Sequence, residues 1–358
     1  MGALIFSCPN PLQFFMTAKL NWGIMTTGVI ARKFVTDLRQ SRTGRIAAVG
    51  ARRLGDAEKF AREFGGAQAH GSYAALLADP EVQAVYIGTP HPLHEEWAVK
   101  AAEAGKHILC EKPLALNLAG AQRIIAAARQ HGVLLMEAYM YRCHPQTLKL
   151  VELVRSGAIG ELRLIRASFN VICNFDPEHR MFKKELGGGA ILDLGCYPVS
   201  FSRLIAGAAL GRLFANPVEF HATGRVHPLT QTDEYAAAVA KYPGDIIAEL
   251  SCGSTVVHDV SARIYGTKGW LDVPEPFTTG LLGKEEKIYL HRPGASAPEK
   301  ITIASPDMGL YAYEADAVAA AVARGEREVP QMTWADTIGN MTTLDAWVAA
   351  AGVSYEGI

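Results

Sequence analysis

The sequence predicts two domains: an α/β Rossmann domain, followed by an α+β domain with a large, mostly antiparallel open sheet. From Leu20 to Arg142, short apolar runs alternate with amphipathic helical patterns, which is typical of a doubly wound parallel sheet. After residue 143, strand-like runs follow one another with turn signals and few helices, which indicates antiparallel pairing. The boundaries that follow are 1–19 for an N-terminal extension, 20–142 for the Rossmann domain, 143–330 for the α+β domain, and 331–358 for a C-terminal helix that packs back on the body.

The first domain is expected to contain strands and helices in strict alternation. Gly105 and Gly132 stand where left-handed caps would end two of the helices. The predicted strands are 21–25, 45–50, 84–88, 107–110 and 133–137. The predicted helices are 29–38, 55–64, 94–104 and 118–129.

The second domain is expected to be rich in strands. The predicted strands are 162–171, 218–226, 234–242, 246–252, 261–265, 270–273, 287–291 and 300–303. The predicted helices are 145–155, 190–205, 310–323 and 333–350. A sheet of this size leaves one face without helices, and a soluble monomer rarely keeps so large an apolar face exposed. We therefore expect a homodimer or homotetramer that pairs these faces.

The composition excludes several classes of protein. The 358 residues are 49% hydrophobic and carry a formal net charge of −1, which gives no electrostatic case for nucleic acid or an anionic membrane. No apolar run approaches the roughly 20 residues of a membrane helix. Residues 1–15 lack the basic region and cleavage site of an export signal. The six scattered cysteines fit reduced thiols in a cytoplasmic protein, and their spacing indicates neither disulfides nor a metal site.

A glycine-containing turn follows the first strand. Against the dinucleotide pattern G-x-G-x-x-G/A, Thr26 stands at the first glycine, Gly28 at the second and Ala31 at the third. Gly28 would let the backbone approach a pyrophosphate resting on the helix N-terminus. An ordinary strand–helix turn is the alternative. The candidate cofactor residues of this turn are Thr26, Thr27, Gly28, Val29 and Ile30.

Arg52 and Arg53 follow the second strand, where an NAD-binding domain places an acid for the ribose 2′-hydroxyl. A guanidinium binds a 2′-phosphate through two charge-assisted hydrogen bonds, whereas an acid repels it. The pair favours NADP over NAD, unless both arginines only solvate a loop.

Four more candidate cofactor contacts follow the strand at 84–88, namely Thr89, Pro90, His91 and His94. A loop at this carboxyl edge of the sheet would lie along the nicotinamide half of the cofactor. Each histidine could equally cap a helix or lie on the surface.

The strand at 107–110 runs directly into Glu111, Lys112 and Pro113. Ligands of open α/β sheets bind at this edge, and Pro113 restricts the backbone of Lys112. A solvated surface ion pair is the alternative. We predict that Glu111 and Lys112 contact the cofactor and that Lys112 is the first candidate for chemistry.

Asp193 and Tyr197 stand four residues apart on a predicted helix that is otherwise apolar, so both should project from one face. Oxidation of an alcohol requires a base for the hydroxyl proton. Free tyrosine titrates at about 10, and an ammonium within hydrogen-bond distance would lower that value. We predict Tyr197 as acid/base, Lys112 as electrostatic stabiliser and Asp193 as orienter, with Lys112 as the alternative proton-transfer group.

Substrate contacts are expected near the domain junction, in addition to Lys112, Asp193 and Tyr197. The candidates are Tyr139, Tyr141, Arg142, His144, Asn170 and His179. Each could instead have a structural role. Polar and aromatic residues of this kind suit a sugar or polyol, and Arg142 also allows a substrate that carries a carboxylate.

Together these motifs resemble the Gfo/Idh/MocA family of NAD(P)-dependent oxidoreductases, and most closely its branch with dimeric dihydrodiol dehydrogenase and related aldose dehydrogenases. The matching segments are Gly23 to Ala31, Thr89 to His94, Glu111-Lys112-Pro113 and Asp193 to Tyr197. The resemblance implies a Rossmann domain and a second domain whose sheet packs against that of another subunit. Many members carry histidine where this chain has Tyr197, so the resemblance is weakest at the base.

The sequence thus predicts an NADP-dependent oxidoreductase that transfers hydride between nicotinamide and a sugar, polyol or diol carbon. One alternative is a glycoside hydrolase that uses its nicotinamide transiently, although the sequence offers no additional acid clearly placed for a leaving group. The other is a nucleotide sensor without catalysis, which would need neither Lys112 nor Tyr197.

Overall fold

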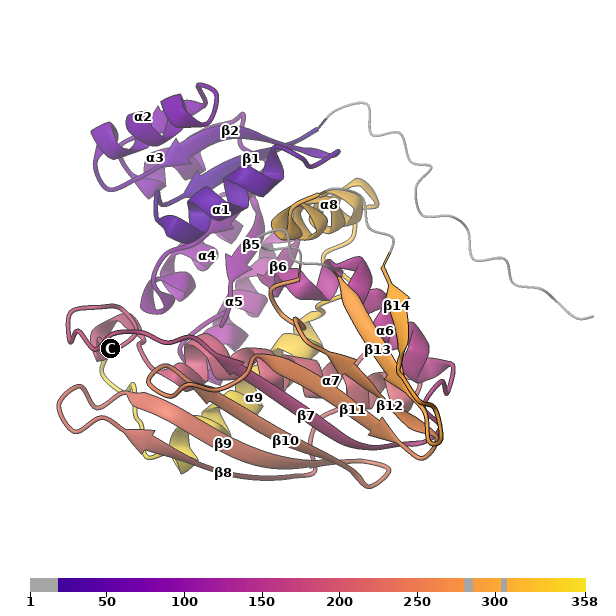
Figure 1. Ribbon diagram of the computed structural model, residues 1–358. Helices are drawn as coiled ribbons and strands as arrows, with labels where there is room; N and C mark the ends of the chain where they lie inside the picture. Colours follow the sequence, from indigo (N-terminus) through magenta and orange to yellow (C-terminus); the bar gives the residue numbers. More distant parts are fainter. Residues whose placement is uncertain (1–18, 280–285, 304–307) are drawn as a thin grey trace, which may run out of the picture.

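The computed structural model describes residues 19–279, 286–303 and 308–358. These residues form a six-stranded sheet and an eight-stranded sheet, each with its own helices (Figure 1). The predicted fold class is confirmed. Residues 1–18, most of the predicted extension, lie outside the described residues.

The first sheet is parallel throughout and has the order β3-β2-β1-β4-β5-β6. Its strands are β1 (Leu20–Met25), β2 (Gly44–Gly50), β3 (Gln68–His70), β4 (Ala84–Ile87), β5 (His107–Glu111) and β6 (Leu135–Ala138). All four residues of β4 are buried, as expected where helices cover both faces of a parallel sheet. The sequence missed β3, which has only three residues and therefore shows no measurable period.

The helices of this domain are α1 (Val29–Leu38), α2 (Leu54–Glu63), α3 (Tyr73–Ala78), α4 (His94–Glu103) and α5 (Leu118–His131). The short α3 was not predicted. α5 shows how local residues set the ends of a helix. The Asn117 side chain accepts a hydrogen bond from the Gly120 amide at 3.0 Å, and Gly132 ends the helix with φ +69°.

The second sheet has the order β14-β13-β12-β11-β7-β10-β9-β8, and only β7 and β10 pair in parallel. Its strands are β7 (Leu162–Asn170), β8 (Glu219–Val226), β9 (Asp233–Tyr242), β10 (Ile246–Gly253), β11 (Ser261–Gly266), β12 (Gly269–Val273), β13 (Lys287–His291) and β14 (Glu299–Thr302). The helices α6 (Pro145–Arg155), α7 (Cys196–Ala209) and α9 (Trp334–Ala350) lie over one face, between the sheet and the first domain, and the other face is open (Figure 1).

The last two helices tie the domains together. α8 (Leu310–Ala323) packs against α1 of the first domain, although the sequence boundaries group it with the second. α9 contacts α5 on one side and α7 and β8 on the other. No helix among the described residues is long and apolar enough to cross a membrane.

Glu137, on β6, connects the core to the loop that carries Lys112. Its Oε1 accepts a hydrogen bond from the Leu114 amide at 2.9 Å, and the residue is only 1% exposed. Burial raises the pKa of Glu137 from 4.5 to about 7. Between these two pH values the Glu137 carboxyl keeps its proton in the folded protein and releases it in the unfolded chain. The free energy of unfolding therefore falls as the pH rises from 4.5 to 7.

We expect Glu137→Gln to remove this pH dependence. Relative to the variant, the parent protein should lose roughly 3 kcal/mol of unfolding free energy between pH 4.5 and pH 7.5. Urea titrations of both proteins across this range would measure the difference. A constant difference at all pH values would contradict the raised pKa.

Candidate active site

The strand order of the first sheet reverses between β1 and β4, and a crevice for ligands opens at such a point. Thr26, Thr27, Gly28, Val29 and Ile30 all lie on the turn from β1 into α1. Thr89 and Pro90 follow β4 at the same edge. The structure therefore brings two of the predicted cofactor segments to one crevice.

The turn after β1 leaves room for a ligand. Thr26, at the first glycine position, has φ +98°, a backbone conformation that glycine adopts most easily. A Cβ added to Gly28 would meet only Thr26 Oγ1, at 3.7 Å. No side chain caps the first amides of α1, and Val29 beside them is 87% exposed. This helix N-terminus is open to an anion such as a pyrophosphate.

Thr89 supports the same conclusion from the neighbouring strand. Its Oγ1 is buried and has no hydrogen-bond partner in the structure, as expected for a group that a ligand would satisfy. The residues present therefore fit a dinucleotide. The β1–α1 turn would hold the phosphates, and Thr89 would lie beside the nicotinamide half.

The two arginines after β2 have different surroundings. Arg53 pairs with Asp56 on α2, with 2.7 Å between Nε and Oδ2, and its side chain is 81% exposed. Arg52 is exposed as well, and no ion pair joins it to another of the described residues. Arg52 is therefore the better placed of the two for a 2′-phosphate.

His94 is held between two loops of the first domain. It is fully buried, and its ring nitrogens lie 2.8 Å from the Thr89 carbonyl oxygen and 3.0 Å from the Pro113 carbonyl oxygen. The ring thus joins the loop after β4 to the loop after β5, which favours a structural role over the predicted cofactor contact.

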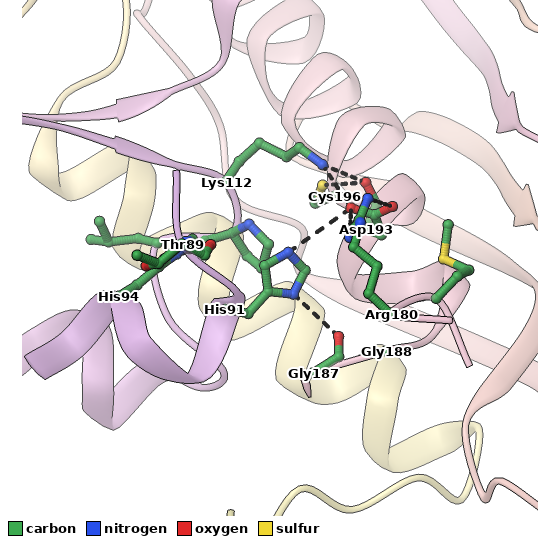
Figure 2. A network of polar contacts seen from close by, with 12 residues as sticks. Thr89, His91, His94, Lys112, Arg180, Gly187, Gly188, Asp193 and Cys196 are labelled. Atoms are coloured by element: carbon green, nitrogen blue, oxygen red, sulfur yellow. Dashed lines mark hydrogen bonds and ion pairs between the residues drawn. The ribbon is translucent and has the colours of Figure 1, made fainter. Parts of the chain in front are cut away.

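Lys112 belongs to a polar cluster whose shared partner is the buried Asp193 carboxylate (Figure 2). Its Nζ donates to the backbone oxygen of Asp193 at 2.7 Å and lies 3.2 Å from Asp193 Oδ1. Arg180 holds the same carboxylate, with 2.9 Å between its NH2 nitrogen and Oδ2. Lys112 and Asp193, two of the three predicted catalytic residues, thus form an ion pair, and Arg180 adds a second cation.

The charges of this cluster support one another. Burial alone would raise the pKa of Asp193, but Lys112 and Arg180 hold it far below its ordinary value. Burial likewise opposes the charge on Lys112, and the Asp193 carboxylate outweighs it and raises the pKa of Lys112. Lys112 is therefore a stable ammonium at neutral pH.

His91 and Glu111 border the cluster. His91 Nδ1 lies 3.1 Å from the Gly187 carbonyl oxygen, so that nitrogen carries the proton. Burial lowers the pKa of His91 to about 3, and the ring is neutral at physiological pH. Glu111 Oε1 accepts a hydrogen bond from the Tyr86 hydroxyl at 2.6 Å, and burial raises the pKa of Glu111.

Asp193 lies on a π-helical turn, η4 (Ile191–Gly195), whereas the sequence predicted a continuous α-helix. Such wide turns are frequent at functional sites. Asp233 supports this turn from β9, since its Oδ2 accepts a hydrogen bond from the Ile191 amide at 2.6 Å. The Tyr355 hydroxyl supports the segment just before this turn by donating a hydrogen bond to the Gly188 carbonyl oxygen at 2.5 Å.

Tyr197 faces Lys112 with its ring and not with its hydroxyl. Lys112 Nζ lies 4.9 Å from the centroid of the Tyr197 ring, and the hydroxyl donates to Met140 Sδ at 3.5 Å. Burial raises the pKa of Tyr197 well above 10, which is the opposite of the predicted shift. The acid/base role of Tyr197 and the orienting role of Asp193 stay predictions.

Three predicted substrate contacts bond to other residues of the domain junction. The Tyr141 hydroxyl donates to Ser200 Oγ at 2.9 Å, and the buried Arg142 guanidinium pairs with Asp336 of α9. His144 Nδ1 accepts from the Gln146 amide and so caps α6. These side chains are engaged within the core, which favours the structural alternative over the substrate contacts expected of them.

The two candidates from the second domain hydrogen-bond to residues outside the cluster. Asn170, at the end of β7, donates to the Asp259 backbone oxygen at 3.1 Å. His179 is exposed and accepts from the Met181 amide at 3.3 Å. The residue that does reach the cluster from this segment is Arg180, which the sequence analysis missed because no period or motif marks it.

Comparison with known proteins assigns the chain to a family. Residues 20–139 match the family model described as the oxidoreductase family with an NAD-binding Rossmann fold, and residues 147–272 match the GFO/IDH/MocA C-terminal domain. The chain belongs to the Gfo/Idh/MocA oxidoreductase family. The resemblance found in the motifs is therefore confirmed.

Known proteins are similar to this chain over nearly its whole length. The chain is 35% identical over 340 residues to the trans-1,2-dihydrobenzene-1,2-diol dehydrogenase of Xenopus tropicalis, covering 93% of this chain and 98% of the relative. A 3-ketoreductase of Actinomadura kijaniata, solved with TDP-benzene and NADP, superimposes with a TM-score of 0.80 at 29% identity, over 93% of this chain and 98% of that one. An aldose–aldose oxidoreductase of Caulobacter crescentus shares the fold, with a TM-score of 0.83 at 24% identity over 93% of this chain and 98% of that one. The protein is thus a dehydrogenase or reductase that acts on CH–OH groups.

Proposed function

We propose that this Gfo/Idh/MocA protein uses NADP to oxidise or reduce a sugar, polyol or diol carbon. The observation that supports this most is the Lys112–Asp193 pair at the carboxyl edge of the first sheet, beside the open N-terminus of α1. The NADP-bound ketoreductase and the dihydrodiol dehydrogenase are relatives whose chemistry fits this site.

When bound, the nicotinamide supplies the hydride acceptor for oxidation or the hydride donor for reduction. Lys112 supplies the polar catalysis. Its ammonium would donate a hydrogen bond to the substrate oxygen and stabilise the negative charge that develops there. In reduction it would also deliver the proton, and Asp193 keeps it charged and oriented. The buried, neutral Tyr197 shapes the pocket wall above Lys112.

A direct assay tests this function. The purified protein, NADP⁺ and a panel of aldoses, polyols and trans-diols should produce reduced cofactor, which absorbs at longer wavelength than the oxidised form. No turnover in either direction with either dinucleotide would contradict it. Cleavage of a chromogenic glycoside without net change in the cofactor would instead indicate the hydrolase considered from the sequence.

We expect Arg52→Ala to lower the affinity for NADP by about ten- to a hundredfold and to leave the affinity for NAD almost unchanged. A charge-assisted contact with the 2′-phosphate contributes roughly 1.5–3 kcal/mol. Fluorescence titration with both dinucleotides measures the effect. Arg62→Ala, an exposed arginine later on α2, serves as the control. Equal weakening of both dinucleotides would show that Arg52 serves the fold.

We also propose that the open face of the second sheet pairs with a second copy of the chain. Tyr235 and Val239 on β9 and Ile247 on β10 are between 42% and 48% exposed on this face, beside a shallow hollow of about 580 Å³. Pairing two such faces about a two-fold axis would bury them in both chains. A tetramer would add further contacts to the same dimer.

Light scattering should therefore give a mass of at least twice 38.6 kDa. Val239→Arg should shift the particle toward the monomer, because it places a charge in the buried centre of the interface. Leu148→Arg on α6 is the matched control, since both side chains are 48% exposed and α6 covers the opposite face. A monomeric parent protein at micromolar concentration would contradict this assembly.

The cysteines support a reducing compartment, which we propose to be the cytoplasm. Cys110, Cys143, Cys173, Cys196 and Cys252 are free, and four of them are buried. Buried unpaired thiols are typical of proteins that fold where glutathione keeps cysteine reduced.

A further inference from the structure

Arg180 is held firmly at the wall of the active site. Its two terminal nitrogens lie 2.9 Å and 3.3 Å from the two oxygens of Asp193 (Figure 2). The next residues, Met181 and Phe182, are buried and anchor the segment. The Gly189 amide donates to the Met181 carbonyl oxygen at 2.9 Å, which fixes the backbone beside Arg180. The position of the guanidinium is therefore set by packing.

Arg180 is the second cation beside Asp193. Asp193 already has a cationic partner in Lys112, so two cations share one carboxylate. His91, which also lies beside Asp193, is neutral at physiological pH. Glu111 accepts a hydrogen bond from the Tyr86 hydroxyl, and its charge acts on both cations without pairing directly with Arg180. Asp193 therefore does not depend on Arg180 as its sole cation.

Arg180 is also the accessible member of the cluster. Its side chain is 56% exposed, whereas those of Lys112 and Asp193 are 10% and 7% exposed. A guanidinium has five N–H donors, and the Asp193 pair uses two of them. Among the described residues, no second hydrogen-bond or ion-pair partner engages the other donors of Arg180.

We propose that Arg180 binds an anionic group of the substrate, a carboxylate or a phosphate carried near the carbon that exchanges hydride. This inference rests on the proposed function and narrows its substrate class to sugar acids, sugar phosphates and related anionic polyols. Arg142, which the sequence offered for this purpose, is only 2% exposed and pairs with Asp336, so it cannot take this role. Guanidinium recognises both anions through two parallel hydrogen bonds.

Binding of two matched polyols tests the proposal without requiring turnover. Gluconate and glucitol have the same six carbons and differ only in the carboxylate at one end. Calorimetry on the full chain with saturating NADP⁺ should show gluconate binding at least about tenfold more tightly. In Arg180→Met the ratio of the two dissociation constants should fall to about one, and Arg180→Lys should retain part of it.

Lys183→Met is the control, because Lys183 lies on the same segment and pairs with Glu178 away from the cluster. It should leave the ratio unchanged. The pair of glucose 6-phosphate and glucose, measured in the same way, distinguishes phosphate from carboxylate. A parent protein that binds both members of each pair equally overturns the proposal, and so does an Arg180→Met variant that keeps the parent ratio. Selective gluconate binding without hydride transfer from any substrate would support Arg180 and contradict the proposed function.

Discussion

Replacing Lys112 with methionine is expected to slow hydride transfer by roughly 10²–10⁴-fold. Methionine keeps the length of the side chain and removes the ammonium that would stabilise charge on the substrate oxygen. It also leaves the buried Asp193 carboxylate with Arg180 as its remaining close cation. The affinity for NADP should change little, because the phosphates are expected on the β1–α1 turn, whereas Lys112 follows β5.

Lys106→Met is the matched control for this experiment. Lys106 lies just before β5, at the opposite end of the strand from Lys112, and its Nζ donates to the backbone oxygens of Asp79 and Val82 at 2.8 and 2.7 Å. This variant should lose stability and keep its turnover number. If Lys112→Met retains more than a tenth of the parent rate, the proton-transfer role passes to another group, and Tyr197 is the first to test.

Replacing Asp336 with asparagine is expected to lower the free energy of unfolding by roughly 3–5 kcal/mol. Asp336 lies on α9 and pairs with two buried cations, Arg142 and Arg203, which are 2% and 0% exposed. Arg203 NH1 also donates to the Asp336 backbone oxygen at 2.8 Å. Among the described residues, Asp336 is the carboxylate that pairs with both guanidinium groups. Asparagine removes its charge, and a buried uncompensated charge is expensive.

Urea titration monitored by tryptophan fluorescence measures this loss. Asp245→Asn is the control, because the Asp245 side chain is 86% exposed beside Lys241 and should contribute less than about 1 kcal/mol. Arg142→Met adds a second readout. It should destabilise the protein and leave the KM for any polyol unchanged, whereas a raised KM would restore the substrate role first expected of Arg142.

The sequence by itself determined the two-domain fold and the position of the central lysine. Strand and helix periods are local. The apolar patterns on either side of Gly28 and before Lys112 therefore predicted β1, α1 and β5 within a residue or two. Glu111-Lys112-Pro113 at a strand end is also a local signal, and so is the apolar helix pattern around Asp193. These features require no knowledge of distant contacts.

Only the tertiary structure decided which side chains meet. The parallel pairing of β7 with β10 joins strands that are far apart in the chain, and no local period encodes it. Arg142 and Arg180 are chemically identical in the sequence, yet burial beside Asp336 assigns the first to the core, and the anchored loop places the second beside Asp193. The π-helical turn and the direction of the Tyr197 hydroxyl likewise depend on packing. Side-chain partners of this kind are fixed by long-range packing and charge compensation, which become defined only when both domains are folded.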